Sequence, residues 1–166
     1  SNVNQMWEFD IIGSAVFWIK AYTLDSSGYQ PRITAGTVNY GGSPMFNSGT
    51  KLKTTYYNSS TKWTLIPVDG KKITRIDPDA TYRISFKTDP AKGLDVSGTS
   101  LDNGANVHLW TYSGLSNQKW KFEYITTGEY ANKGYYYIKA VHSGSYIHAE
   151  NGNLDGNPNI HQWAGT

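Results

Sequence analysis

The chain has 166 residues, 17% of them charged, and its 15 lysine and arginine residues nearly balance 13 aspartate and glutamate residues. This length is typical of one domain that folds on its own, and the charge balance excludes the strongly basic surface of a nucleic-acid-binding protein. The absence of cysteine excludes disulfides and thiolate sites, and no apolar stretch reaches the roughly 18 residues of a membrane-spanning helix.

Short runs of β-branched and aromatic residues follow one another along the chain, with little helical periodicity. The runs are separated by Gly, Asn, Asp and Pro, and the clearest lie at 15–21, 81–88, 120–125 and 135–141. Such runs predict β-strands. Their close spacing and glycine-rich turns predict an all-β sandwich or barrel.

Three units of the chain follow one plan of four strands. Each unit opens with an aromatic strand, at 17–21, 82–87 and 136–140. A second short strand follows a glycine-containing turn, most clearly at 93–96 and 145–149. A Gly/Asn loop then leads to a third strand, at 106–110 and 159–163, and the fourth strand opens on a recurring tryptophan. The plan predicts twelve strands with threefold symmetry.

The recurring tryptophans are Trp7, Trp63 and Trp120, and one unit is divided between the two chain ends. Trp110 lies ten positions before Trp120, and Trp163 lies ten positions before Trp7 when the ends are joined. We therefore expect residues 1–11 to complete the third unit in their own chain, as adjacent termini allow. The division indicates either a circularly permuted order of the units or a chain cut from a longer protein, which the lack of an initiator Met favours. In the second case, residues 1–11 could instead close the unit of a neighbouring copy.

Gln-x-Trp endings at 118–120 and 5–7, with Leu94-Asp95-Val96 and His108-Leu109-Trp110 upstream, resemble the ricin-type lectins and family 13 carbohydrate-binding modules. The resemblance implies a β-trefoil, in which six strands form a short barrel and six form hairpins at one end. It covers residues 81–166 and 1–11 well and 14–70 weakly. It implies one domain, 1–166, with a first unit at 14–70, a middle unit at 81–127 and a split unit at 134–166 closed by 1–11.

The resemblance implies a nearly complete sugar site in the middle unit. Sites of this family combine polar groups that bind vicinal hydroxyls with a ring that covers the C–H face of the sugar. By position, Asp95 is the acceptor, Trp110 the stacking ring and Asn117 the hydroxyl-binding amide. His108 stands where the family often has glutamine, and Gln118 is expected to brace Asp95. The alternative is structural: Asp95 caps a turn, and Trp110 joins Trp120 in the core.

The split unit keeps only part of this set, namely Asn4, Gln5, His161 and Trp163. His148 stands fifteen positions before Trp163, where the middle unit has Asp95 before Trp110. A neutral imidazole does not offer the paired acceptors of a carboxylate. Glu150 would face the same side of a regular strand as His148 and is a candidate replacement.

The first unit departs furthest from the family. By the count from Trp63, Lys53 stands where the stacking ring belongs, and Thr61 replaces the glutamine. We expect no sugar site of this type there. The insertion at 25–50 is rich in Gly, Ser, Asn and Pro, which predicts a long surface loop or, alternatively, a protein-contact loop.

No residue pattern indicates catalysis or a metal or cofactor site. The sequence predicts a secreted or extracellular lectin module for galactose-like or xylose-like sugars, with no nucleic-acid partner and no membrane insertion. Weak single sites would gain affinity from a homo-oligomer or a larger parent protein. The alternatives are a protein-binding trefoil, as an inhibitor or toxin-complex subunit, and the accessory module of a glycoside hydrolase.

Overall fold

The computed structural model describes residues 3–13, 16–22, 30–35, 50–55, 62–72, 75–150 and 158–165. These ranges contain the predicted twelve strands and three short 3-10 helices: η1 (Val3–Gln5), β1 (Trp7–Gly13), β2 (Val16–Ala21), β3 (Arg32–Ala35), β4 (Thr50–Thr55), β5 (Lys62–Pro67), β6 (Tyr82–Phe86), β7 (Asp89–Val96), η3 (Ser97–Thr99), β8 (Val107–Thr111), η4 (Ser116–Gln118), β9 (Trp120–Tyr124), β10 (Tyr135–Ala140), β11 (Tyr146–Ala149) and β12 (Ile160–Trp163). Among the described residues, no helix is long and apolar enough to span a membrane.

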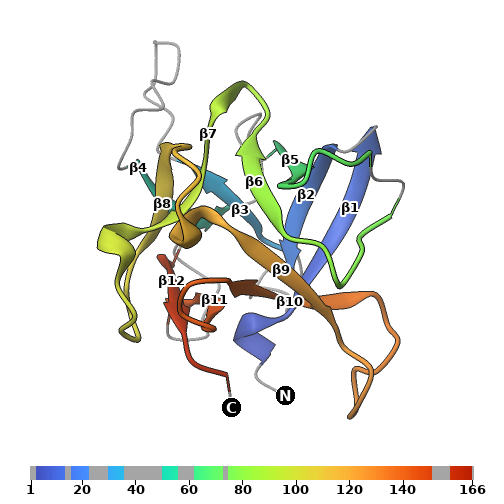
Figure 1. The fold of residues 1–166 in the computed structure, drawn as a ribbon. Coiled ribbons are helices and arrows are strands. Elements are labelled where there is room, and N and C mark those ends of the chain that lie inside the picture. Colours follow the sequence, from blue (N-terminus) through green and yellow to red (C-terminus); the bar gives the residue numbers. More distant parts are fainter. Residues whose placement is uncertain are drawn as a thin grey trace.

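Six of the strands close into an antiparallel barrel (Figure 1). In order around the barrel, β1 pairs with β2, β2 with β5, β5 with β6, β6 with β9, β9 with β10, and β10 with β1. The other six strands form the hairpins β3–β4, β7–β8 and β11–β12. These hairpins contact one another, because β4 pairs with β8 and β12 packs against both. The architecture is the expected β-trefoil.

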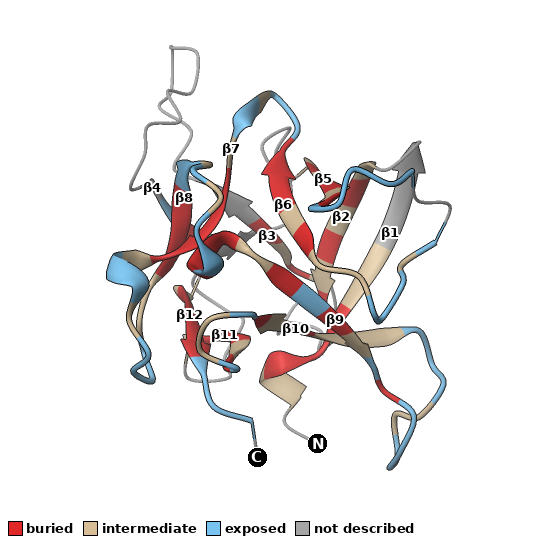
Figure 2. Ribbon diagram, viewed as in Figure 1, coloured by how far each residue is buried: buried red, intermediate tan, exposed pale blue. Residues whose placement is uncertain are grey.

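The strands form because apolar and polar residues alternate with the two-residue period of a β-strand. In β5, for example, Trp63 and Leu65 are buried, and the residues beside them are half-buried. Figure 2 shows buried residues along the strands and exposed residues in the connecting loops. The barrel interior and the inner face of the hairpins therefore share one apolar core.

The three recurring tryptophans are buried and make equivalent hydrogen bonds. In each unit the indole Nε1 donates to a carbonyl oxygen of the unit's second strand: Trp7 to Ile147 at 3.1 Å, Trp63 to Ile33 at 3.0 Å and Trp120 to Leu94 at 3.2 Å. A buried N–H requires an acceptor, so the repeat places both an apolar ring and a donor at these positions. The bond also joins the barrel to each hairpin.

The two chain ends meet inside the split unit. Gln5 Nε2 donates to the carbonyl oxygens of Trp163 at 3.1 Å and Ala164 at 3.2 Å. Trp7 pairs with Tyr136 of β10, and the N and C labels lie side by side in Figure 1. β1, the first strand of the chain, therefore completes the split unit, whose other three strands are β10, β11 and β12.

One strand is longer than its sequence pattern indicated. The pattern predicted a strand at 93–96, but β7 begins at Asp89 and bends at a register shift opposite Ser85 and Phe86. Gly93 lies so close to β6 that a Cβ atom there would be 2.6 Å from the carbonyl oxygen of Ile84. A glycine is therefore needed where the two backbones cross.

Candidate functional site

The three hairpins can be aligned by strand register. In each unit, the buried indole donates to a carbonyl oxygen on the second strand. The next residue along that strand pairs with a residue on the third strand. These pairs are Asp95 with His108, His148 with His161, and Thr34 with Lys53. The three pairs are equivalent positions in the threefold fold, so their chemistry can be compared directly.

This register corrects the alignment of the first unit. Lys53 is the counterpart of His108 and does not stand at the stacking position. Trp110 pairs with Gly93, and the equivalent pair in the first unit is Thr55 with Arg32. The count from Trp63 fails because Thr55 lies eight positions before Trp63, whereas its counterpart Trp110 lies ten positions before Trp120. Thr61 and most of the insertion at 25–50 lie outside the described residues.

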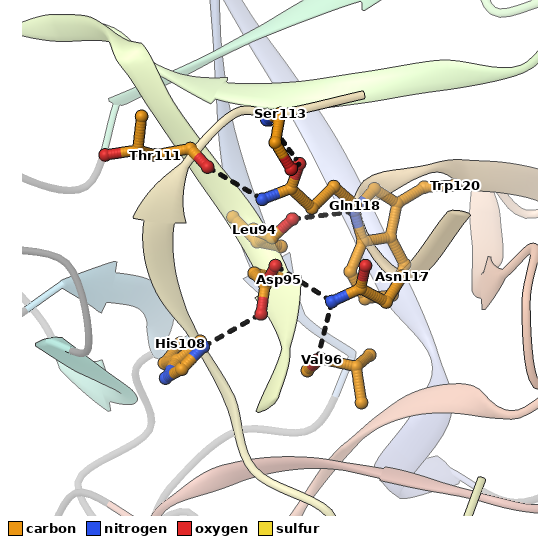
Figure 3. Close-up of polar contacts among 9 residues, drawn as sticks. All are labelled: Leu94, Asp95, Val96, His108, Thr111, Ser113, Asn117, Gln118 and Trp120. Atoms are coloured by element: carbon orange, nitrogen blue, oxygen red, sulfur yellow. Dashed lines mark hydrogen bonds and ion pairs between the residues drawn. The ribbon is translucent and has the colours of Figure 1, made fainter. Parts of the chain in front are cut away.

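In the middle unit, Asp95 lines a surface cavity of about 350 Å³. Its carboxylate is buried and fixed from both sides, as Figure 3 shows. His108 Nε2 lies 2.9 Å from Oδ1, and Asn117 Nδ2 donates to Oδ2 at 2.9 Å. Each carboxylate oxygen can accept a further hydrogen bond. The site therefore holds an oriented anionic acceptor.

Asn117 positions Asp95, and its amide N–H groups are not available to a ligand. The second N–H of Nδ2 donates to the carbonyl oxygen of Val96 at 2.9 Å, so both donors are used inside the protein. Its Oδ1 is buried without a hydrogen-bond partner. With both donors used and the acceptor buried, this amide offers no exposed hydrogen-bonding group for the expected contact with sugar hydroxyls.

The expectation that Gln118 braces Asp95 is wrong. Gln118 Nε2 donates to the carbonyl oxygen of Thr111 at 2.8 Å, and its Oε1 accepts from Ser113 N at 2.8 Å and Ser113 Oγ at 3.2 Å. Consecutive side chains on a 3-10 turn point about 120° apart, so Asn117 and Gln118 on η4 reach different neighbours (Figure 3). Gln118 fixes the chain that follows Trp110.

Trp110 forms the apolar wall of the cavity. His108 and Trp110 lie two positions apart on β8 and thus on one face, with ring centroids 5.2 Å apart and planes 14° apart. The indole is 43% exposed, while Trp120 is fully buried. Trp110 is therefore outside the core, and the structural alternative for it is wrong.

Five residues of the cavity wall were missed by the sequence reasoning: Ser97, Gly98, Thr99, Ser113 and Leu115. They lie shortly after Asp95 or shortly before Asn117 in the sequence. Their closeness to these two predicted site residues was the only feature of the sequence that could have identified them. Thr99 has a positive φ of 54°, which is uncommon for a residue other than glycine. Such backbone conformations cost energy and occur often at ligand sites.

In the split unit, His148 and His161 form a buried pair. His148 Nδ1 lies 2.8 Å from His161 Nε2, the ring planes differ by 2°, and the centroids are 4.9 Å apart. A nitrogen contact this short between coplanar rings means that the imidazoles meet edge to edge. Trp163 lies beside both rings and is 39% exposed. The split unit thus keeps the exposed indole and replaces the carboxylate.

Burial keeps this histidine pair uncharged at neutral pH. Desolvation lowers the pKa of His148 to about 4, and the neighbouring His161 adds to the effect. Desolvation also lowers the pKa of His161, which the negative charge of Glu150 opposes. Glu150 is not on the regular strand that the sequence predicted, because β11 ends at Ala149. Its backbone N–H donates to Asn159 O at 3.0 Å, and it acts on His161 by its charge.

The segment 97–106 connects the two sites. It begins at the wall of the middle cavity, and Gln162 Nε2 donates to the carbonyl oxygens of Ser100 at 2.8 Å and Asp102 at 2.9 Å. Asn103 Oδ1 accepts from Ala164 N at 2.7 Å. His142 Nε2 also lies 2.9 Å from Ser100 O. Hydrogen bonds therefore tie this segment to β12, the strand of His161 and Trp163.

Residues 116–166 match the family model described as ricin-type beta-trefoil lectin domain-like. A comparison with curated protein sequences gave no match. Among solved structures, the designed threefold-symmetric protein ThreeFoil has a TM-score of 0.62 at 21% identity, over 98% of this chain and 91% of that chain.

Two natural proteins show the same fold. A lectin of Polyporus squamosus, bound to a human-type influenza-binding epitope, has a TM-score of 0.60 at 16% identity. The exo-beta-1,3-galactanase 1,3Gal43A of Clostridium thermocellum has a TM-score of 0.61 at 21% identity. The alignments cover 95% and 98% of this chain, but 46% of the lectin and 28% of the galactanase. The chain therefore corresponds to one part of each longer protein.

Proposed function

We propose that this domain is a carbohydrate-binding lectin module without catalytic activity, and that it binds galactose-like or xylose-like sugars in the cavity above Asp95. One observation carries the proposal. A buried carboxylate, held between His108 and Asn117, faces a cavity with an exposed indole as its wall. We call this cavity the Asp95 pocket.

The donors and acceptors of the Asp95 pocket suit a pair of neighbouring hydroxyls. Each oxygen of Asp95 accepts one internal hydrogen bond and has capacity for one more. Two vicinal hydroxyls can each donate to one oxygen, and hydrogen bonds to a charged acceptor are stronger than neutral ones. Because His108 and Asn117 already fix the carboxylate, binding does not have to order it.

The indole of Trp110 suits the other face of a pyranose. A sugar ring has one face rich in C–H groups, and a flat aromatic surface covers that face without desolvating a charge. The pocket volume of about 350 Å³ is at the small end for ligand sites. The combination favours a single sugar residue that is uncharged and presents a diol opposite its apolar face.

A pocket for one sugar binds weakly, so we propose that affinity comes from multivalency, through an oligomer or a larger parent protein. The proposed module is one domain, 1–166, with units at 14–70, 81–127 and 134–166 closed by 1–11, and its proposed location is secreted or extracellular. The match to 28% of the galactanase chain supports a related role as the accessory module of a glycoside hydrolase. Joining this domain to a glycosidase and measuring hydrolysis of insoluble polysaccharide would test that role.

A glycan array with competition by free galactose and free xylose tests the proposal. We expect binding to glycans that carry one of these sugars at a terminus, and loss of binding when the free sugar is added. The double variant Asp95→Asn, Trp110→Ala should lose the signal. Tyr124→Ala is a matched control, because Tyr124 is exposed and does not line the Asp95 pocket. An unchanged signal in the double variant would refute the assignment.

A further inference from the structure

The split unit has the same architecture as the Asp95 pocket but a different charge. His148 and His161 stand at the register positions of Asp95 and His108, and Trp163 stands at that of Trp110. The two histidines are 9% and 6% exposed, against 5% and 8% for Asp95 and His108. A ligand therefore has similar access to both pairs. The exchange of a carboxylate for an imidazole removes the negative charge.

The histidine pair offers hydrogen bonds that a carboxylate does not. When uncharged, the rings share one N–H···N bond, so one outward nitrogen is a donor and the other is an acceptor. When the pair gains one proton, both outward nitrogens become donors and the pair carries one positive charge. An outward N–H beside this positive charge can donate a charge-assisted hydrogen bond to an oxygen of a carboxylate.

We propose that the surface formed by His148, His161 and Trp163 binds sugars that carry a carboxylate, of the uronic acid class, and takes up one proton as it does so. Trp163 supplies the face that stacks on the sugar ring, as Trp110 does in the Asp95 pocket. The inference rests on the proposed carbohydrate binding and adds a second ligand class. The two surfaces of one domain then prefer ligands of different charge.

Several charged or titratable residues lie near the pair and on the strands packed against it. Within the described residues, burial and the neighbouring His161 lower the pKa of His148, and burial lowers the pKa of His161 while Glu150 raises it. The charged or basic residues on the strands packed against β11 and β12 are Lys51, Lys53, His108 and Lys139. Lys139 Nζ binds Glu123 Oε1 at 2.9 Å and His108 binds Asp95, so these two are engaged elsewhere.

Glu150, which directly follows β11, affects the protonation of the pair. Its charge raises the pKa of His161 against the effect of burial. Glu150 therefore favours the protonated pair, in which the outward nitrogens are donors. Tyr146, also on β11, donates its hydroxyl to Glu123 Oε2 at 2.8 Å and takes no part in the pair.

Proton uptake gives the interaction a defined pH dependence. Because the pair is uncharged near neutrality, each bound carboxylate brings one proton with it. The affinity should then rise as the pH falls below 7, by up to about tenfold per pH unit. A sugar carboxylate stays ionised over this range, since free α-carboxyl groups titrate near 3.5. A ligand without a carboxylate should show no such slope.

Galactose and galacturonic acid form a matched pair of ligands, because they differ only in the carboxylate at C6. Titrations followed by NMR of the indole N–H signals report on each surface separately. Trp110→Phe and Trp163→Phe assign the two exposed indoles. We expect galacturonate to shift the Trp163 signal, with an affinity that rises as the pH falls below 7 by up to about tenfold per pH unit. We expect galactose to shift the Trp110 signal at all pH values.

Three variants sharpen the test. His148→Asp recreates the charge pattern of the Asp95 pocket, and it should abolish the galacturonate response of Trp163 and introduce a galactose response. His161→Gln should remove both the response and the slope. His142→Gln is the matched control, since His142 lies outside the pair and binds Ser100 O; it should leave both unchanged. Circular dichroism checks folding, and the wild-type titrations decide the question even where a variant fails to fold.

The outcomes separate this inference from the proposed function. If galacturonate fails to shift Trp163, shifts only Trp110, or binds with an affinity that does not depend on pH, the inference is overturned. If Trp110 responds to no neutral sugar, the proposed function fails, and the Trp163 titration still decides the inference. Equal responses of Trp163 to galactose and galacturonate would also overturn it, because the carboxylate would then contribute nothing.

Discussion

Trp120 Nε1 donates a hydrogen bond of 3.2 Å to the carbonyl oxygen of Leu94, the residue immediately before Asp95. The buried core is thereby attached to the strand that carries Asp95, the carboxylate proposed to bind the sugar. Trp63 and Trp7 make the same bond in the other two units. The fold and the candidate site therefore depend on adjacent residues of one strand.

Replacing this tryptophan should weaken the fold without changing sugar preference. Trp120→Phe removes the donor, leaves the oxygen of Leu94 unsatisfied and opens a cavity, so we expect the free energy of unfolding to fall by about 2–4 kcal/mol. Urea unfolding measures the change. Trp110→Phe is the control, because its exposed indole should cost under about 1 kcal/mol. Equal losses in the two variants would contradict the assignment of core and site.

Replacing the site residues should have the opposite effect. Asp95→Asn removes the charged acceptor, and the loss of about 1.5–3 kcal/mol for such a bond corresponds to a drop in sugar affinity of roughly 10- to 100-fold. Trp110→Ala should weaken binding by a similar factor, and Trp110→Tyr should keep part of it. Isothermal titration calorimetry with the best sugar from the array measures these affinities. Retained affinity in Asp95→Asn would place the sugar elsewhere.

Replacing Asn117 and replacing Gln118 should have different effects, the first on sugar affinity and the second on stability, although the two residues are adjacent in the sequence. Asn117→Ala frees one oxygen of Asp95 and the carbonyl of Val96, so we expect a loss of sugar affinity of roughly tenfold, near 1.4 kcal/mol. Gln118→Ala frees the segment after Trp110 and should mainly lower the melting temperature, by roughly 2–8 °C. Calorimetry and thermal melts on both variants compare the two effects. An equal loss of affinity in both would show that Gln118 also acts on the carboxylate.

The stability of the domain should fall in mild acid. The unfolded chain protonates His148 near its ordinary pKa of 6.5, whereas the folded chain does so only at about 4. Between these values the unfolded state binds more protons, so the free energy of unfolding decreases as the pH falls. Thermal melts at pH 7, 5.5 and 4.5 should show this decrease, and His148→Gln should reduce it. The same slope in His148→Gln would assign the effect to other groups.

The fold was largely predictable from the sequence, because its determinants repeat. The spacing of Trp7, Trp63 and Trp120 and the four-strand plan predicted twelve strands and threefold symmetry, and the structure confirms both. The start of β7 at Asp89 was not predictable, since the segment 89–92 lacks the apolar alternation of a strand.

The candidate site was predicted as a set of residues, but not as a network of contacts. Asp95, His108 and Trp110 come together as the motif indicated. The direction of Gln118 depends on its place in a 3-10 turn, which the sequence does not display. Lys53 was misplaced because the count from Trp63 assumed a constant loop length, and only strand register reveals the difference.

The hydrogen bonds of the segment 97–106 would set the geometry of the proposed multivalent recognition. Gln162 and Ala164 hold this segment against β12, so the Asp95 pocket and Trp163 lie on one braced frame. These hydrogen bonds would hold the two proposed ligand contacts at a fixed spacing and angle. A branched or densely packed glycan whose residues match that spacing would be retained far longer than one that offers the same sugars at another distance.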